Sequence, residues 1–137
     1  MSITLMLTPT QTRYLDKYLE LDQGVIKWST WDAPFGRTTL LRVIALIEAR
    51  EKPVTVLVPD TMHVKHFLRN PIFEHLNVSI TSKEVRYGYG IRVFSCSYPE
   101  GILGCHRDCI LVDDSWRIDR DLIQRQIGGS QKMFICE

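Results

Sequence analysis

The chain is organised around Trp31-Asp32-Ala33-Pro34-Phe35-Gly36-Arg37-Thr38-Thr39. The apolar run before this stretch, Val25-Ile26-Lys27-Trp28, has the length and residue types of a β-strand. The run after it, Leu40-Leu41-Arg42-Val43-Ile44-Ala45-Leu46-Ile47, has the length of a helix. Proline and glycine between two such runs are typical of a tight loop. We therefore predict a strand, a tight loop and a helix that opens on Arg37-Thr38-Thr39.

This layout is typical of a phosphate-binding P-loop, in which the N-terminus of a helix presents backbone N–H groups to an anion. The consensus of such loops is G-x-x-x-x-G-K-[ST]. Gly36 and Thr38 match it, whereas Trp31 replaces the first glycine and Arg37 replaces the lysine. Two interpretations stay open: a phosphate-binding loop with a substituted lysine, or a turn in an α/β domain that binds no nucleotide.

A second informative stretch is Cys109-Ile110-Leu111-Val112-Asp113-Asp114-Ser115, in which residues of the buried type lead directly into two carboxylates. Open α/β sheets bind ligands outside the carboxyl ends of their strands. Asp113 and Asp114 therefore occupy a position suited to a ligand site. The other interpretation is a solvated turn or a pair of helix-cap residues after a strand. If both stretches belong to one sheet, the loop and the acidic pair meet along the same edge.

The rest of the chain alternates between strand-like and helix-like segments. Thr8, Pro9 and Gln11 form a capping-box pattern, so a purely structural role is open to Gln11. Strands alternating with helices predict an α/β fold whose largely parallel sheet is covered on both faces. The further predicted segments are a strand at 54–58, a helix at about 62–68 that closes at Asn70-Pro71, a hairpin at 85–94, a helix capped by Asp119 that runs to about Gln126, and a strand at 133–136.

Size and composition indicate a single globular domain. The 137 residues suffice for one domain but not for two ordinary ones. Hydrophobic residues make up 45% and charged residues 24%, which excludes a disordered chain. The formal net charge of +1 excludes a strongly basic nucleic-acid-binding protein. No apolar run approaches the roughly 20 residues that a membrane span needs, and the N-terminus lacks a signal-peptide pattern, so we expect a cytoplasmic protein without membrane contact.

The sequence contains two further groups of metal-ligand residue types. Cys105-His106 and Cys109 form a C-H-x-x-C cluster, but no second pair stands at ligand spacing. We therefore predict reduced, mostly buried thiols and no structural zinc. His63 and His66 share a helix face, and we interpret both as surface histidines, because no carboxylate nearby completes a site.

The order and spacing of these motifs resemble the N-terminal ATPase domain of viral DNA-packaging terminase large subunits and, more distantly, the first lobe of superfamily two helicases. The resemblance extends over nearly the whole chain. Ala33–Thr39 is similar to the Walker A loop with its lysine replaced, and Ile110–Asp114 is similar to Walker B. Thr8–Gln11 is similar to the segment whose glutamine reads adenine. The other similar segments are Val56–Pro59, near which such motors contact DNA, Ile91–Ser97 and Gly101–Gly104, which lead to Walker B, and Lys132–Cys136, which precedes the coupling motif.

The resemblance implies a single P-loop NTPase-like (RecA-like) domain over residues 1–137, built as a three-layer sandwich, that is either complete or part of a longer motor protein. The implied function is binding of ATP with Mg²⁺ and hydrolysis coupled to translocation of double-stranded DNA. Other motor subunits and the cytoplasm of a host cell are the implied partners and location. The alternative is a non-catalytic module of the same fold that binds DNA or a protein partner.

The resemblance also implies roles for individual residues. Arg37 would replace the phosphate-binding lysine, Thr38 and Asp113 would hold Mg²⁺, and Asp114 would replace the glutamate that polarises the attacking water. Gln11 would read adenine. The expected nucleotide-binding residues are Gln11, Pro34, Phe35, Gly36, Arg37, Thr38 and Thr39, and the expected catalytic residues are Asp114 and Arg37.

Two substitutions in this pattern affect catalysis more than binding. Arginine is a planar fork, whereas lysine is a compact point charge. Aspartate draws the carboxylate of residue 114 back by one methylene, and a misplacement of about 1 Å can cost roughly 100-fold in rate. An arginine finger would come from Arg117, Arg120, Arg125 or another subunit.

The hairpin contains residue types that contact nucleic acids elsewhere. Because the overall charge is near neutral, we favour ordinary exposed side chains there over a nucleic-acid surface. The residues concerned are Lys83, Arg86, Tyr87, Tyr89 and Arg92.

Overall fold

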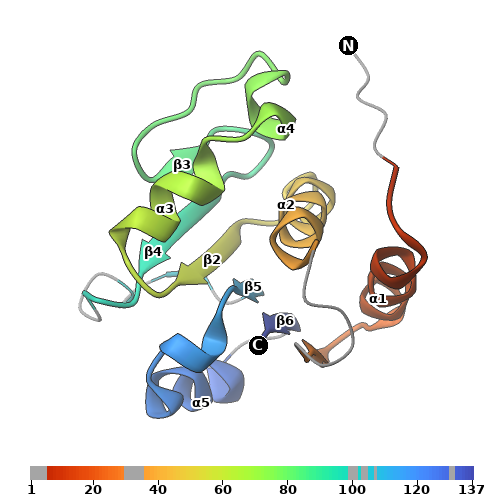
Figure 1. Cartoon of the computed structure of the whole chain (residues 1–137), viewed down its shortest axis with the longest axis vertical. Helices are drawn as coiled ribbons and strands as arrows, with labels where there is room; N and C mark the ends of the chain where they lie inside the picture. Colours follow the sequence, from red (N-terminus) through yellow and green to blue (C-terminus); the bar gives the residue numbers. More distant parts are fainter. Residues whose placement is uncertain (1–5, 30–35, 99–101, 103–104, 107, 130–131) are drawn as a thin grey trace.

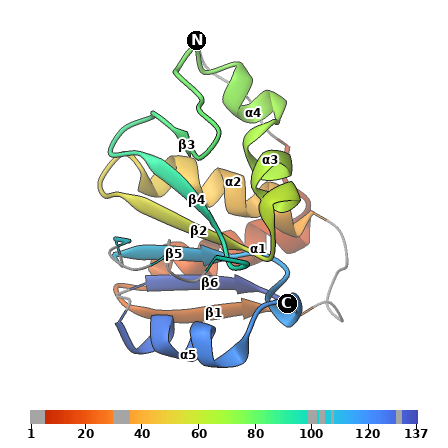
Figure 2. The same ribbon diagram turned by 90° about the vertical axis from the view of Figure 1, so that its left-hand side faces the viewer.

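The computed structural model describes residues 6–29, 36–98, 102, 105–106, 108–129 and 132–137. Within these residues a six-stranded sheet has the strand order β1-β6-β5-β2-β4-β3 (Figures 1 and 2). Neighbouring strands run parallel, except that β3 pairs antiparallel with β4 at one edge. The predicted α/β fold with a mostly parallel sheet is thus confirmed. The strands are β1 (Gly24–Trp28), β2 (Val54–Val58), β3 (Glu84–Val85), β4 (Ile91–Ser95), β5 (Cys109–Val112) and β6 (Lys132–Cys136).

Helices cover both faces of this sheet. On one face lie α1 (Pro9–Glu20), α2 (Arg37–Glu48) and α3 (Thr61–Leu68), and on the other lies α5 (Arg120–Gly129), so the sheet separates α2 from α5 in Figure 1. Strand residues alternate between the two sides. Leu111 and Phe134 join the hydrophobic cluster under α1 and α2, whereas Ile110 and Met133 join the cluster under α5. Among the described helices, none is long and apolar enough to cross a bilayer.

Capping residues set the helix starts where the sequence predicts them. Thr8 forms the complete capping box of α1, and Asp119 Oδ1 accepts a hydrogen bond of 2.7 Å from the backbone N–H of Asp121 at the start of α5. α3 begins at Thr61, one residue before the predicted start. α5 continues to Gly129, beyond the predicted end near Gln126.

Two connections between the main elements can be compared with the sequence prediction: the hairpin agrees with it, and the segment around Asn70 differs from it. The predicted hairpin is confirmed, because β3 and β4 pair Val85 with Ile91. The Asn70-Pro71 pair, predicted to close a helix, also opens a short helix α4 (Pro71–Glu74). The Asn70 side chain accepts a hydrogen bond from the Ile72 N–H, and proline suits the first position of a helix because it has no N–H to satisfy there.

The parallel strands bring the polar segments to one edge of the sheet. α2 follows β1 in the chain, α3 follows β2, and Asp113 and Asp114 follow β5. β6 lies between β1 and β5. The carboxyl ends of these strands therefore bring together the start of α2, the start of α3 and the acidic pair.

Candidate functional site

Gly36 places the start of α2 against α1. It is the N-cap of α2, with φ 84° in the left-handed region. Its carbonyl accepts a hydrogen bond of 2.8 Å from Gln11 Nε2. A Cβ at this position would lie 2.6 Å from that same nitrogen. Glycine is therefore required here both by the backbone conformation and by the close approach of Gln11.

Gln11 has two structural roles. Its Oε1 accepts a hydrogen bond of 2.8 Å from the Thr8 backbone N–H, which confirms the predicted capping box. Its Nε2 joins α1 to Gly36, a contact that the capping pattern does not predict. Because both ends of the amide are engaged and the side chain is buried, reading of adenine by Gln11 requires these bonds to rearrange.

Thr38 and Asp113 connect the start of α2 to the end of β5. The Thr38 hydroxyl donates a hydrogen bond of 2.8 Å to Asp113 Oδ2. Asp113 is only 5% exposed. Burial raises the pKa of its carboxyl, and the hydrogen bond from Thr38 opposes that rise. Two residues predicted to hold the same ion thus meet in space, although 75 positions separate them in sequence.

Arg37 brings a positive charge with one unpaired nitrogen to the same place. Its Nη1 is buried, and no described residue accepts a hydrogen bond from it. The charge of Arg37 acts on Asp113, whose pKa it lowers, although burial has the larger and opposite effect. A buried donor without an acceptor is costly, so this nitrogen marks a position where an anionic ligand would gain a hydrogen bond.

The side chain of Asp114 contacts a residue of a different helix, α3. Its backbone lies in the left-handed region with φ 47° and ψ 51°, which is uncommon for a residue other than glycine. Its Oδ2 lies 3.1 Å from His63 Nε2, while His63 Nδ1 lies 2.7 Å from Asp60 Oδ1. The interpretation of His63 as a surface histidine without a carboxylate nearby is therefore wrong. Asp60, three residues earlier, was the available sequence signal, whereas the contact with Asp114 arises only in the fold. His66 is exposed, as expected.

Among the described residues, no side-chain hydrogen bond or ion pair joins the remaining predicted site residues to Thr38 or Asp113. Thr39 lies in the first turn of α2 beside Thr38. Pro34 and Phe35 lie outside the described residues. Of the candidate arginine fingers, Arg117 pairs with Asp60 at 3.7 Å, and Arg125 Nε donates to the Asp121 carbonyl of its own helix.

Among the described residues, no three His, Cys, Asp or Glu side chains are arranged so that they could hold a metal ion by themselves. Cys105 packs against the cluster under α5, whereas Cys109 is buried in the cluster on the opposite face, with its Sγ 3.1 Å from the Tyr18 hydroxyl. Burial raises the pKa of the Cys109 thiol to about 12, which keeps it protonated. The C-H-x-x-C pattern therefore does not bring its two thiols together. The oxygens of Thr38 and Asp113 are of the kind that Mg²⁺ prefers.

A basic groove lies beside α3. It has a volume of about 540 Å³ and is lined by three cations, Lys65 of α3, Lys83 before β3 and Arg92 of β4. Phe94 and Tyr98 add aromatic surface. Of the hairpin residues considered above, Lys83 and Arg92 line the groove. Arg86 and Arg92 both lie near the Glu84 carboxylate, at 3.2 Å and 4.0 Å, and the Tyr87 hydroxyl accepts a hydrogen bond from Arg50.

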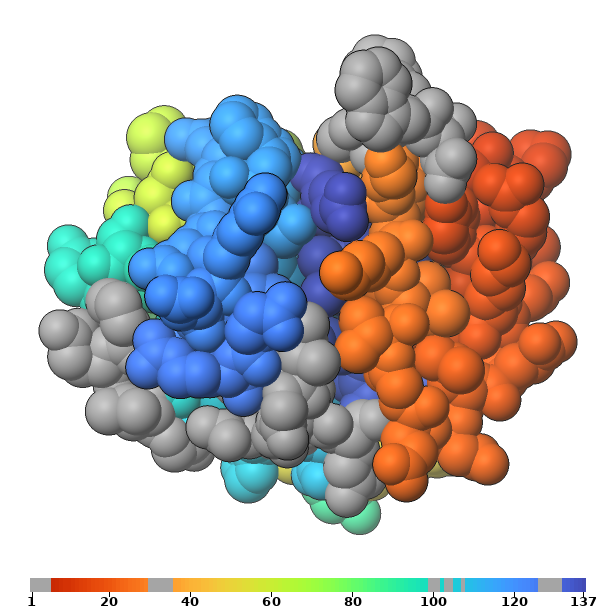
Figure 3. Space-filling view, turned by 90° about the horizontal axis from the view of Figure 1, so that it is seen from below, coloured from red at the N-terminus to blue at the C-terminus, as the bar shows by residue number. Residues whose placement is uncertain are grey.

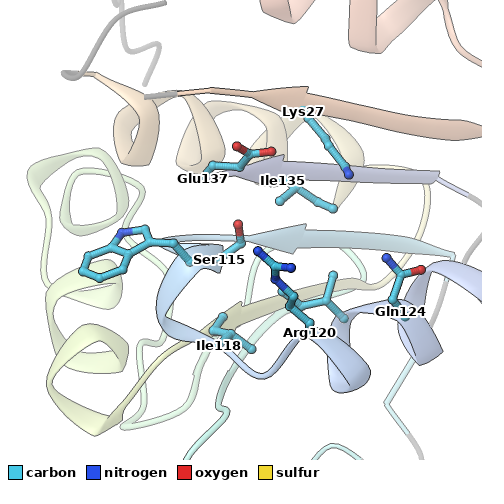
Figure 4. Close-up of a pocket in the computed structure, with 9 residues that line it drawn as sticks. Lys27, Ser115, Ile118, Arg120, Gln124, Ile135 and Glu137 are labelled. Atoms are coloured by element: carbon cyan, nitrogen blue, oxygen red, sulfur yellow. The ribbon is translucent and has the colours of Figure 1, made fainter. Parts of the chain in front are cut away.

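A second hollow, of about 410 Å³, lies on the α5 face. Figure 3 shows it as a furrow between β1 and α5, with β6 at its floor. Lys27 and Arg120 extend toward it from β1 and α5, and Glu137 lies beside them (Figure 4). Its walls include Ile118 and Ile135 of the cluster under α5, so it opens on the face opposite to Thr38 and Asp113.

The site is therefore defined by its geometry: a left-handed glycine, a helix N-terminus, a buried Arg37 Nη1 without an acceptor and a hydroxyl–carboxylate pair at the carboxyl ends of the parallel strands. Comparison of the chain with protein-family models and with curated proteins finds no match.

Proposed function

We propose that this chain is a P-loop NTPase-like (RecA-like) module that binds ATP with Mg²⁺ at the start of α2. The observation that carries the proposal is the hydrogen bond between Thr38 and Asp113. It joins a hydroxyl in the first turn of a helix to a buried carboxylate at the end of a parallel strand. A P-loop site needs these two groups side by side, because together they hold the metal ion that accompanies the phosphates.

Two further features support phosphate binding at this place. The first backbone N–H groups of a helix have no acceptor within the helix, and in α2 the first such bond runs from Leu40 N–H to the Gly36 carbonyl. The preceding N–H groups and the helix dipole favour an anion. Arg37 adds a positive charge with a buried, unsatisfied nitrogen.

The oxygens of Thr38 and Asp113 fit Mg²⁺, which would neutralise negative charge on the phosphates. The chain itself supplies the remaining interactions. Arg37 and the N–H groups of α2 orient the phosphates, and Asp114 is the group able to accept a proton from an attacking water. Arg37 replaces lysine, and the side chain of Asp114 is one methylene shorter than the glutamate. We therefore propose that this module retains its affinity for ATP but hydrolyses it slowly.

The basic groove supports a role in which nucleotide binding is coupled to double-stranded DNA. Lys65, Lys83 and Arg92 suit contacts with a phosphate backbone, and Phe94 and Tyr98 lie among them. Other motor subunits and a host cytoplasm belong to the same proposal. The second candidate function, a non-catalytic module that binds DNA, rests on this groove alone.

The decisive experiment is titration calorimetry of the purified chain with ATP and with a non-hydrolysable analogue, each with and without Mg²⁺. We expect binding that requires Mg²⁺. Thr38→Val keeps the shape of the side chain but removes the hydroxyl, so it should weaken binding at least about tenfold. Thr12→Val, at an exposed position in the first turns of α1, is the matched control. No binding to the parent at millimolar nucleotide would contradict the proposal and favour the DNA-binding module.

A further inference from the structure

His63 contacts the acidic pair from a helix that lies outside the nucleotide site. It stands in the first turn of α3, and its side chain is 22% exposed. Nε2 lies 3.1 Å from Asp114 Oδ2, and Nδ1 lies 2.7 Å from Asp60 Oδ1. Asp60 also caps α3 by accepting a hydrogen bond from the His63 backbone N–H. The ring is therefore fixed to α3 on one side and holds Asp114 on the other.

The two neighbouring carboxylates are held by different helices. Asp113 accepts its hydrogen bond from Thr38 of α2, whereas Asp114 faces His63 of α3. α2 follows β1 and α3 follows β2, and these two strands lie on opposite sides of β5. The side-chain contact of Asp114 thus joins it to α3, whereas that of Asp113 joins it to the start of α2. Its left-handed backbone, with φ 47°, accompanies this orientation.

We propose that His63 is a positioning residue that holds Asp114 in an inactive orientation, so that hydrolysis requires the contact between them to break. The inference rests on the proposed nucleotide site. A water that attacks the terminal phosphate would lie near the start of α2, and a carboxylate that accepts its proton must come within hydrogen-bond distance of it. While Asp114 contacts His63, the module binds nucleotide, but this carboxylate does not reach the attacking water.

Substitutions of His63 separate this role from the support that it gives to α3. Glutamine places an amide N–H near the position of Nε2 and retains a donor for Asp114. Asparagine places its amide near Nδ1, on the side of Asp60, and loses Asp114. We expect His63→Ala and His63→Asn to raise ATP turnover about tenfold, which corresponds to ~1.4 kcal/mol in the barrier. His63→Gln should stay near the parent rate, and all three should keep the parent affinity for Mg²⁺-ATP within about twofold.

His66→Ala is the matched control, because His66 is an exposed histidine on the same helix. It should change neither turnover nor affinity. If His63→Ala lowers the melting temperature too far for assay, His63→Asn carries the same test with the Asp60 side of the ring position still filled.

A readout without nucleotide tests the contact itself. In ¹⁵N spectra of the histidine rings, the His63 signals are those that His63→Gln removes. Asp114→Asn should shift the His63 Nε2 resonance, whereas Asp121→Asn, an exposed aspartate of α5, should leave it unchanged. An unchanged resonance in Asp114→Asn would overturn the inference.

The kinetic outcomes are equally decisive. Turnover of His63→Ala and His63→Asn at or below the parent rate, with Mg²⁺-ATP bound as tightly as by the parent, would overturn the inference and leave the nucleotide site intact. Absence of Mg²⁺-dependent binding to the parent would instead remove the proposed function, and this inference with it.

Discussion

Among single residues, Asp113 shows most clearly how the site conflicts with stability. Its carboxylate is buried at the end of β5, and burial raises its pKa because the charged form loses contact with water. Hydrogen bonds from the Thr38 hydroxyl and the Asp114 backbone N–H offset part of that cost. A buried carboxylate that destabilises the fold but stands ready for a cation is the arrangement expected of a functional group.

Asp113→Asn should therefore raise the melting temperature at neutral pH while abolishing Mg²⁺-dependent nucleotide binding. The folded pKa lies above the ordinary value of 3.8, so the native carboxylate costs stability above the folded pKa and costs none below 3.8. The increase in melting temperature of Asp113→Asn should therefore be complete at neutral pH and should vanish as the pH falls below 3.8. Paired thermal melts across this range measure it. A variant less stable than the parent at neutral pH would contradict the argument.

For the elements, the contact between α1 and the start of α2 depends on Gly36. Gly36→Ala adds a Cβ 2.6 Å from Gln11 Nε2 to a residue with φ 84°. We expect a loss of about 2 kcal/mol in the free energy of unfolding, because the strained backbone and the displaced capping residue both contribute. Gly90→Ala is the control, since Gly90 has φ 98° but no atom within 4 Å of the added Cβ. Urea unfolding should show the larger loss for Gly36→Ala; equal losses would mean that the contact with Gln11 contributes nothing.

The elements also show what the sequence can and cannot predict. The starts of α1 and α5 follow from local chemistry, since each cap and its partner lie within three residues. The meeting of the start of α2 and Asp113 follows from the parallel arrangement of strands, which alternation with helices implies. The contact of His63 with Asp114 joins residues 51 positions apart, and no periodicity or spacing encodes it. The short helix α4 was missed because Asn-Pro is a signal both for ending a helix and for starting one.

For the whole molecule, a buried group of charges lies at the amino ends of the parallel strands, opposite to the candidate site. Lys132, the first residue of β6, lies 3.9 Å from Glu48 at the end of α2, and both side chains are buried. The Lys132 ammonium also lies 4.0 Å from the centre of the Tyr18 ring of α1. Lys52 pairs with Glu48 from the solvent side. These contacts fasten α1, α2 and β6 together about 15 Å from Thr38, by the rise of a helix.

Glu48→Leu should therefore destabilise the protein by about 3 kcal/mol, because it leaves the Lys132 charge buried without its carboxylate. The double substitution Glu48→Leu with Lys132→Met should recover most of that loss, since two apolar side chains replace a buried pair whose desolvation is costly. Denaturant unfolding of the parent, both single variants and the double variant measures the coupling. Affinity for Mg²⁺-ATP should remain within about twofold of the parent, because the start of α2 is distant. If Glu48→Leu and the double variant were equally destabilised, the buried Lys132 charge would not be the cause of the loss, and the argument would be contradicted.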